Sequence, residues 1–332
     1  MKKILYVLVL AALFACERGE EEKCAVQPDV SENVSVHFEH FQDSLINISS
    51  KRKLLSLLSR QPGLRDYIFR RGEYPDDSVF VQSLMRKFNN RNMDTLYMET
   101  KRIFGDHSDL ERQFTEAFTN LKHYYPDFNP PKVQTVVSGL DSDMLVSDTL
   151  IIISLDFYLG RKGKYRPQMY EYILRRYDPE DIVPSCMLLY GIDAKRNATD
   201  LNDKTVLAEM IAYGKSFYFA KHMLPCVPDS VFVWYTPSEI KGARENEDLI
   251  WDRFLQDKVI FSTSMITKRN YVGERPFTSQ VGEKCPGRIA RWVGWRIVKQ
   301  YMNAHPEVTL QQLMKEPDAQ KIFKESGYKP RG

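Results

Sequence analysis

The sequence lacks the short motifs that identify most enzymes. It contains no G-x-x-x-x-G-K-[ST] phosphate loop, no G-x-G-x-x-G dinucleotide fingerprint and no G-x-S-x-G nucleophile elbow. No C-x-x-C pair occurs, and none of the six histidines belongs to an H-E-x-x-H motif. The common nucleotide, hydrolase and zinc signatures are therefore excluded as a basis for assigning a function.

Charge of one sign is also lacking. The chain of 332 residues carries 47 Lys and Arg against 44 Asp and Glu, so its formal net charge is only +3. A nucleic-acid-binding surface needs a clear basic excess, so we expect no nucleic-acid partner. Hydrophobic residues make up 43% and charged residues 27% of the chain, which is the composition of an ordinary globular protein.

A single long apolar run stands at the start of the chain. Lys2 and Lys3 precede this run at residues 4–14, which is too short to span a bilayer. The run ends in Leu-Phe-Ala-Cys, which resembles the lipobox of bacterial lipoproteins. The resemblance implies that residues 1–15 are a signal peptide and that acylated Cys16 holds the protein on a membrane. The alternative is a plain secretory signal that ends at a cysteine.

Residues 16–32 continue with a charged run, Glu-Arg-Gly-Glu-Glu-Glu-Lys. Such a run cannot bury itself, so we expect a flexible tether between the lipid and a folded domain at residues 33–328. Acidic residues behind an acylated cysteine also resemble surface-export signals of Bacteroidetes lipoproteins, although a plain linker explains them equally well. We expect the protein in the cell envelope, with the outer membrane favoured and periplasmic or surface exposure left open.

Four cysteines remain after Cys16. Cys24 lies in the predicted tether, whereas Cys186, Cys226 and Cys285 lie in the domain. Because the envelope is oxidising, we expect one disulfide among the three domain cysteines, with the pairing open.

The domain is expected to be mostly helical. Apart from the strongest pattern, apolar residues recur at helical spacing in seven segments: 53–58, 64–69, 77–88, 92–104, 110–125, 248–261 and 289–302. Four short segments favour strands: 33–41, 132–138, 149–155 and 231–235. A turn at 139–143 predicts that the second and third strands form a β-hairpin, and the apolar run at 150–153 predicts a central strand covered on both faces. The predicted class is α+β, a single domain with a small sheet.

The strongest helical pattern covers residues 204–226. Two adjacent apolar rows predict a helix that is buried over most of its circumference, with Lys215 and Ser216 on the remaining face. Gly214 lies in the middle, where glycine costs about 0.5–1 kcal/mol relative to alanine. We therefore expect another element to approach closely at Gly214.

Carboxylates are the remaining candidates for chemistry. Asp156 follows the predicted central strand, and Glu245 and Glu247 precede Trp251 at the start of a predicted helix. Together with Lys215 they could form the site of a hydrolase, which we retain as an alternative. A salt-bridged helix start is the simpler interpretation, because these carboxylates lack histidine partners for a metal.

Residues 165–177 are rich in tyrosine and arginine. Such a cluster could bind an anion or a glycan, which gives a second alternative, a glycan-binding surface lipoprotein. Arginine side chains packed on tyrosine rings at a surface are the simpler interpretation.

Five segments in the same order resemble the GldB family of gliding-motility lipoproteins of Bacteroidetes. They read Tyr-Pro-Asp-Phe at 125–128, Ile-Ser-Leu-Asp-Phe-Tyr-Leu-Gly at 153–160, Tyr-Gly-Lys-Ser-Phe-Tyr at 213–218, Tyr-Thr-Pro at 235–237 with Glu-Asn-Glu at 245–247, and Pro-Gly-Arg-Ile at 286–289 with Val-Gly-Trp-Arg-Ile-Val at 293–298. The resemblance covers most of residues 34–325 and implies a part in an envelope-spanning gliding apparatus. These segments add Tyr213, Arg288 and Trp295 to the candidate functional cluster.

A looser resemblance is to predicted zinc peptidases of the H-E-x-x-H type, which share the order of strands, buried helix and acidic helix. It places Tyr213, Gly214 and Phe217 where the histidine, glutamate and histidine of that motif would be. The resemblance implies a zincin-like outline without the metal.

Together these observations predict a non-enzymatic, lipid-anchored protein of the cell envelope that belongs to the gliding-motility lipoprotein family. It would act as a scaffold or bind other envelope proteins. We expect no catalytic residues, no metal and no cofactor.

Overall fold

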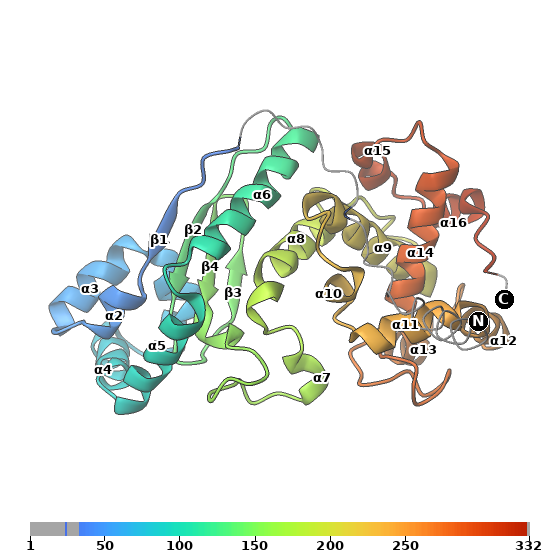
Figure 1. Cartoon of the computed structure of the whole chain (residues 1–332). Coiled ribbons are helices and arrows are strands. Elements are labelled where there is room, and N and C mark those ends of the chain that lie inside the picture. Colours follow the sequence, from blue (N-terminus) through green and yellow to red (C-terminus); the bar gives the residue numbers. More distant parts are fainter. Residues whose placement is uncertain (1–23, 25–32, 331–332) are drawn as a thin grey trace, which may run out of the picture.

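The computed structural model describes residue 24 and residues 33–330, and it places a four-stranded sheet between two sets of helices (Figure 1). The sheet order is β1-β2-β4-β3, formed by β1 (Phe38–His40), β2 (Lys132–Val136), β3 (Met144–Val146) and β4 (Leu150–Ser154). β2 runs parallel to β1 and to β4, whereas β3 is antiparallel to β4. About 57% of the residues that the structure describes are helical, and both sets of helices pack on the same sheet, so the predicted α+β class is confirmed.

β4 is the central strand that the sequence predicts. Ile151 and Ile153 point into the core on one face of the sheet, and Ile152 points into the core on the other face. All three side chains are completely buried. A strand covered on both faces has no need of alternating polar residues, which explains its continuous apolar sequence.

The predicted hairpin between 132–138 and 149–155 is wrong. Those segments form β2 and β4, which are parallel neighbours, and the antiparallel partner of β4 is β3. β3 is only three residues long, too short to show a period in the sequence. The chain turns from β2 toward β3 through Gly139 and Leu140, both with positive φ.

The predicted strand at 231–235 is also wrong, because this segment forms the short helix α10 (Asp229–Val233). An apolar run of five residues fits a helix or a strand equally well. Trp234 ends α10 in the left-handed conformation, with φ of 52°.

The smaller set of helices covers the face of the sheet that carries Ile152. It comprises α2 (Gln42–Ile46), α3 (Lys51–Arg60), α4 (Asp77–Phe88) and α5 (Arg91–Phe104), with a π turn at Leu64–Ile68 and a 3-10 turn at Arg71–Glu73. The side chains of Ser50 and Asp76 cap the starts of α3 and α4. The helices predicted at 77–88 and 92–104 are confirmed, whereas 64–69 forms the π turn rather than an α-helix.

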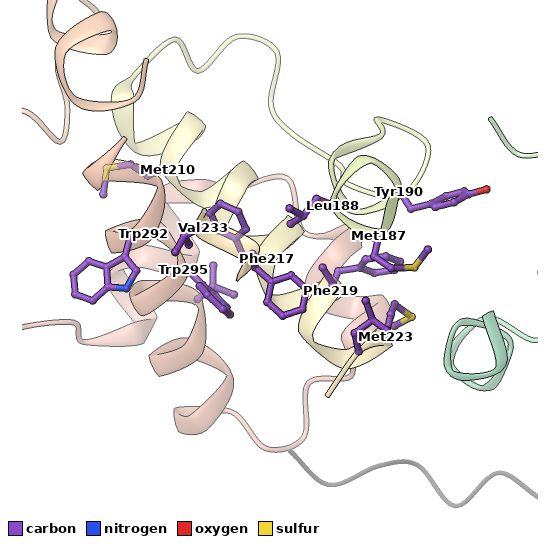
Figure 2. Close-up of a cluster of buried hydrophobic side chains, with 14 of the residues drawn as sticks. Met187, Leu188, Tyr190, Met210, Phe217, Phe219, Met223, Val233, Trp292 and Trp295 are labelled. Carbon is purple, nitrogen blue, oxygen red and sulfur yellow. The ribbon is translucent and has the colours of Figure 1, made fainter. Parts of the chain in front are cut away.

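The larger set covers the opposite face and extends away from the sheet (Figure 1). It comprises α6 (Ser108–Tyr124), α7 (Glu171–Leu174), α8 (Ile182–Ile192), α9 (Val206–Met223), α10, α11 (Pro237–Glu245), α12 (Glu247–Gln256), α13 (Met265–Tyr271), α14 (Ile289–Ala304), α15 (Leu310–Lys315) and α16 (Ala319–Ser326). The helices predicted at 110–125, 204–226 and 289–302 are confirmed as α6, α9 and α14. α9 lies at the centre of this set, between α8 and α14 (Figure 2).

Candidate functional site

α9 and α14 cross at two glycines. A Cβ built on Gly214 would lie 2.4 Å from the carbonyl oxygen of Gly294, and a Cβ on Gly294 would lie 1.9 Å from the carbonyl oxygen of Met210. Both distances are shorter than real Cβ contacts, so the crossing requires glycine on both helices. This is the close approach expected at Gly214, which is therefore a packing residue.

Lys215 and Ser216, which the sequence places on the remaining face of α9, are buried as well. Lys215 is 1% exposed, and its Nζ donates to the carbonyl oxygens of Ala198 at 2.6 Å and Glu316 at 2.8 Å. Ser216 donates from Oγ to the carbonyl oxygen of Leu188 in α8 at 2.9 Å. Burial lowers the pKa of Lys215 to about 8. The amine joins the loop after α8 and the end of α15 to α9.

Asp156 closes the turn that follows β2. Its carboxylate is fully buried and accepts hydrogen bonds from the backbone N–H of Ser138 at 2.9 Å and of Leu140 at 2.6 Å. Burial raises the pKa of Asp156. Because Leu140 has a φ of 63°, the carboxylate stabilises a turn that a leucine rarely adopts.

Glu245 and Glu247 lie on different helices. Glu245 ends α11, and its side chain is 59% exposed. Glu247 begins α12 and accepts hydrogen bonds from Arg296 Nε at 2.9 Å and from the hydroxyl of Tyr328 at 2.6 Å. Glu247 therefore ties α12 to α14 and to the C-terminal segment, whereas Glu245 faces solvent.

Trp251, Arg288 and Trp295 are core residues. Trp251 packs edge-on against Tyr328, with ring centroids 5.1 Å apart. Arg288 is 6% exposed and donates to the carbonyl oxygen of Val233 at 3.1 Å, and burial lowers its pKa to about 10. Trp295 packs against Phe217 in the core between α9 and α14, with centroids 5.5 Å apart (Figure 2).

The predicted candidate residues therefore do not converge on one site. Asp156 lies at the end of the sheet and Lys215 contacts the end of α15. Glu247 and Trp251 both contact Tyr328 in the C-terminal segment. Only Tyr213 of the predicted cluster, together with Phe217 from the peptidase comparison, lines the cavity described next.

A cavity of about 360 Å³ opens between α8, α9, the start of β3 and the start of α14. Its lining is mostly apolar and aromatic and consists of Asp143, Met144, Tyr158, Arg176, Tyr177, Ser185, Leu188, Leu189, Ile192, Tyr213, Ser216, Phe217, Trp234 and Arg291. Binding pockets of proteins have this character, with a few polar groups in an apolar wall. The sequence pointed to part of this cavity, because Arg176 and Tyr177 belong to the Tyr- and Arg-rich segment at 165–177.

Three arginines gather around Glu274, and two of them, Arg176 and Arg291, line the cavity. Arg176 forms an ion pair with Glu274, Arg291 lies 3.5 Å from it and Arg288 lies 3.6 Å from it. The guanidinium of Arg176 also lies over the ring of Trp234, 4.5 Å from its centroid. Glu274 alone does not neutralise three guanidiniums, and counting the second carboxylate at the cavity, Asp143, these five side chains still carry one positive charge in excess.

The cavity lining also includes one carboxylate, that of Asp143. Asp143 accepts hydrogen bonds from the hydroxyl of Tyr177 at 2.9 Å and from the backbone N–H of Met144 at 2.8 Å. Burial and the nearby carboxylate raise the pKa of Tyr177.

The Tyr- and Arg-rich segment does not form one surface. Arg175 pairs with Glu239 at 2.7 Å, while Arg176 and Tyr177 turn into the cavity. Tyr170 is 74% exposed and stacks on Tyr172, with centroids 5.8 Å apart. Within the segment Tyr170 is therefore the exposed aromatic side chain, and Tyr172 is half-buried beside it.

The residues at the peptidase positions do not fit a catalytic zinc ion. Tyr213, Gly214 and Phe217 offer no imidazole, thiolate or carboxylate, and the backbone of Gly294 lies against Gly214. Across residues 33–330 and Cys24, no three His, Cys, Asp or Glu side chains are grouped so that they could hold a metal ion.

The expected disulfide among the three domain cysteines is wrong. Cys226, just after α9, is bonded to Cys24, whereas Cys186 and Cys285 are free. Because Cys24 lies in the predicted tether, nothing in the sequence pointed to this pairing. The bond attaches residue 24 to the end of α9, so the tether is not free along its whole length. The predicted signal peptide, Cys16 and the rest of residues 16–32 lie outside the described residues.

No helix in the described part of the chain is long and apolar enough to cross a membrane. Comparison with curated proteins and with solved structures gives no match, so the zincin-like outline stays a prediction. Residues 23–330 match the family described as gliding motility protein GldB, which confirms the resemblance over nearly the whole chain. The protein therefore belongs to the GldB family of gliding-motility lipoproteins.

Proposed function

We propose that this protein is a non-enzymatic component of the cell envelope, anchored by lipid at Cys16, that binds other envelope proteins. Membership of the gliding-motility lipoprotein family supports the envelope location and the presence of envelope partners. Scaffold function, the outer membrane as its location and the absence of catalysis are parts of the proposal.

The observation that carries the proposal is a group of exposed apolar side chains where α12 connects to α13. Phe261 is 60% exposed, Met265 75% and Ile266 64%, and Leu255 at the end of α12 is 52% exposed. Large apolar side chains that are exposed together are typical of protein-binding surfaces. Their position within twelve residues of one another makes this connection the best candidate for a partner contact.

The contacts of the polar candidate residues support a structural role. Lys215 donates hydrogen bonds to two carbonyl oxygens, and Asp156 accepts them from two backbone N–H groups. Glu247 accepts hydrogen bonds from Arg296 and Tyr328. A hydrolase built on Asp156, Lys215, Glu245 and Glu247 would need these groups to converge, and they lie in separate parts of the fold.

A photo-crosslinking residue at Phe261 or Ile266 tests the proposal in cells that make the full-length protein. We expect both positions to capture the same envelope protein. The matched control is Met98, which is 60% exposed on α5, far along the chain from the proposed contact. Equal capture of that protein at Met98, or no capture at Phe261 and Ile266, would contradict the proposed surface.

The anchor is tested by Cys16→Ser. The variant should keep its signal peptide and lose incorporation of labelled fatty acid, because the acylated thiol is absent. Normal processing and labelling of Cys16→Ser protein would show that the anchor lies elsewhere. Density fractionation of the wild-type membranes then decides whether the outer membrane holds the protein.

The stack of Tyr170 on Tyr172 favours glycan binding as a second candidate function, since exposed aromatic rings pack against sugar faces. A glycan array with wild-type protein and Tyr170→Ala tests it. Binding that is lost in Tyr170→Ala would support this candidate, and an array without a specific signal would remove it.

A further inference from the structure

We propose that the cavity between α8, α9 and α14 binds a compact apolar carboxylate, a ligand with one negative charge attached to an apolar group. The site is separate from the exposed connection between α12 and α13, and it does not depend on the partner contact proposed there.

The charge of the ligand follows from the electropositive wall. Arg176, Arg288 and Arg291 all lie within 3.6 Å of Glu274, which is their shared carboxylate. The side chains of Arg288 and Arg291 are only 6% and 14% exposed, so water screens their charge poorly. Partly buried cations without enough counter-charge are costly, and an anion in the cavity would offset that cost.

The wall also has hydrogen-bond donors to spare. Arg176 uses Nη2 on Glu274, and its Nε is fully enclosed and out of reach of a ligand, whereas among the described residues no acceptor is found for its Nη1. Arg291 uses Nε on the carbonyl oxygen of Val272 and Nη1 on Glu274, and among the described residues no acceptor is found for its Nη2. Two guanidiniums with free N–H groups match the two oxygens of a carboxylate.

Aromatic rings hold these two guanidiniums at the cavity. Arg176 lies over the ring of Trp234, and Arg291 lies over the ring of Tyr213 with its Cζ 4.0 Å from the centroid. Trp234 reaches this position through its left-handed backbone conformation at the end of α10. The donors are therefore pre-oriented, which reduces the entropy lost when a ligand binds.

The rest of the lining selects the apolar part of the ligand. Met144, Leu188, Ile192 and Phe217 present hydrocarbon and aromatic surface. A volume of about 360 Å³ is near the lower end for ligand pockets, so the apolar group must be small. Asp143 also lines the cavity, and its hydrogen bonds from Tyr177 and Met144 leave its negative charge in place, so the carboxylate of the ligand must lie at Arg176 and Arg291 and away from Asp143.

Calorimetric titration of the purified full-length protein, with its Cys24–Cys226 disulfide intact, tests the proposal. The probes are N-acetyl-L-phenylalanine, its uncharged amide, and octanoate. We expect at least one of the two acids to bind. The amide of N-acetyl-L-phenylalanine should bind at least about tenfold more weakly than that acid, because only a carboxylate forms ion pairs with the guanidiniums. The two acids distinguish a peptide C-terminus from a free fatty acid as the source of the carboxylate.

The variants are chosen as matched pairs. Arg176→Gln should weaken binding of the acid at least about tenfold. Arg175→Gln removes the neighbouring arginine, which pairs with Glu239 outside the cavity, and should leave binding unchanged. Ser185→Phe fills the cavity without altering an arginine and should also abolish binding.

Thermal unfolding of each variant shows whether it is folded. Equal binding of acid and amide, equal loss in Arg175→Gln and Arg176→Gln, or no binding of either acid at millimolar concentration would overturn the proposal. Unchanged binding in a folded Ser185→Phe variant would place the ligand elsewhere.

Discussion

Replacing Gly214 by alanine is the most direct test of the packing between α9 and α14. The new Cβ would lie 2.4 Å from the carbonyl oxygen of Gly294 and 2.9 Å from the backbone nitrogen of Trp295. Ordinary van der Waals contact begins at 3.4 Å, so α14 must move away by about 1 Å. Both neighbours are backbone atoms of a helix, which cannot rotate out of the way as a side chain can.

Two opposing terms set the size of the effect. Alanine in a helix interior stabilises the folded state by about 0.5–1 kcal/mol relative to glycine. Overpacking of a dense core costs typically about 1–3 kcal/mol, and contact with rigid backbone favours the upper part of that range. We therefore expect Gly214→Ala to lower the free energy of unfolding by about 1–2 kcal/mol, and Gly214→Leu to lower it further.

Gly242 provides the matched control. It lies within α11, and a Cβ built on it would meet nothing within 4 Å. Gly242→Ala should therefore gain the helix term alone, about 0.5–1 kcal/mol. Urea denaturation followed by circular dichroism measures both variants. If Gly214→Ala were as stable as Gly242→Ala, the reasoning about the glycine crossing would be refuted.

Three further predictions concern single residues. Cys226→Ser should lower the free energy of unfolding of the oxidised protein by about 2–4 kcal/mol, because it opens the bond to Cys24, and Cys285→Ser should not; equal losses would contradict the assigned pairing. Burial raises the pKa of Asp181 to about 8, so the folded state keeps a proton between pH 4 and 8 that the unfolded chain releases, and stability falls as pH rises through this window. Asp181→Asn should gain stability over the wild type steadily from pH 4 to pH 8 in urea melts, and a pH-independent difference would show that the carboxyl is not protonated. Glu247→Gln should cost about 1–3 kcal/mol through its bonds to Arg296 and Tyr328, whereas exposed Glu245→Gln should change stability by less than about 0.5 kcal/mol; similar effects would argue against the assigned contacts.

Amphipathic elements were predictable from the sequence because one face of each meets solvent. α4 matches its predicted bounds, and α5, α6 and α14 differ from theirs by at most two residues at either end. α8 was missed because it is apolar nearly all round and shows no period. The same property of α9 hid the direction of Lys215, since no polar face marks which side of the helix is open.

Pairings between distant residues were not predictable, because local sequence carries no record of them. The parallel alignment of β2 with β4 depends on where β3 is placed, and the bond of Cys226 joins residues 202 positions apart. Likewise Arg176 and Glu274 are ordinary charged residues in the sequence, and only the fold brings them together.

The crossing of α9 and α14 links the packing of the core to the shape of the cavity. Tyr213 directly precedes Gly214, and Arg291 lies one turn before Gly294 on α14, so the contact between ring and guanidinium is set by the distance between the two helices. A substitution at Gly214 that separates the helices by about 1 Å must also separate Arg291 from Tyr213. Stability and ligand binding should therefore change together in Gly214→Ala, whereas Arg176→Gln should change binding while leaving the crossing intact. Neither glycine lines the cavity, so Gly214 and Gly294 affect ligand binding through the distance between α9 and α14.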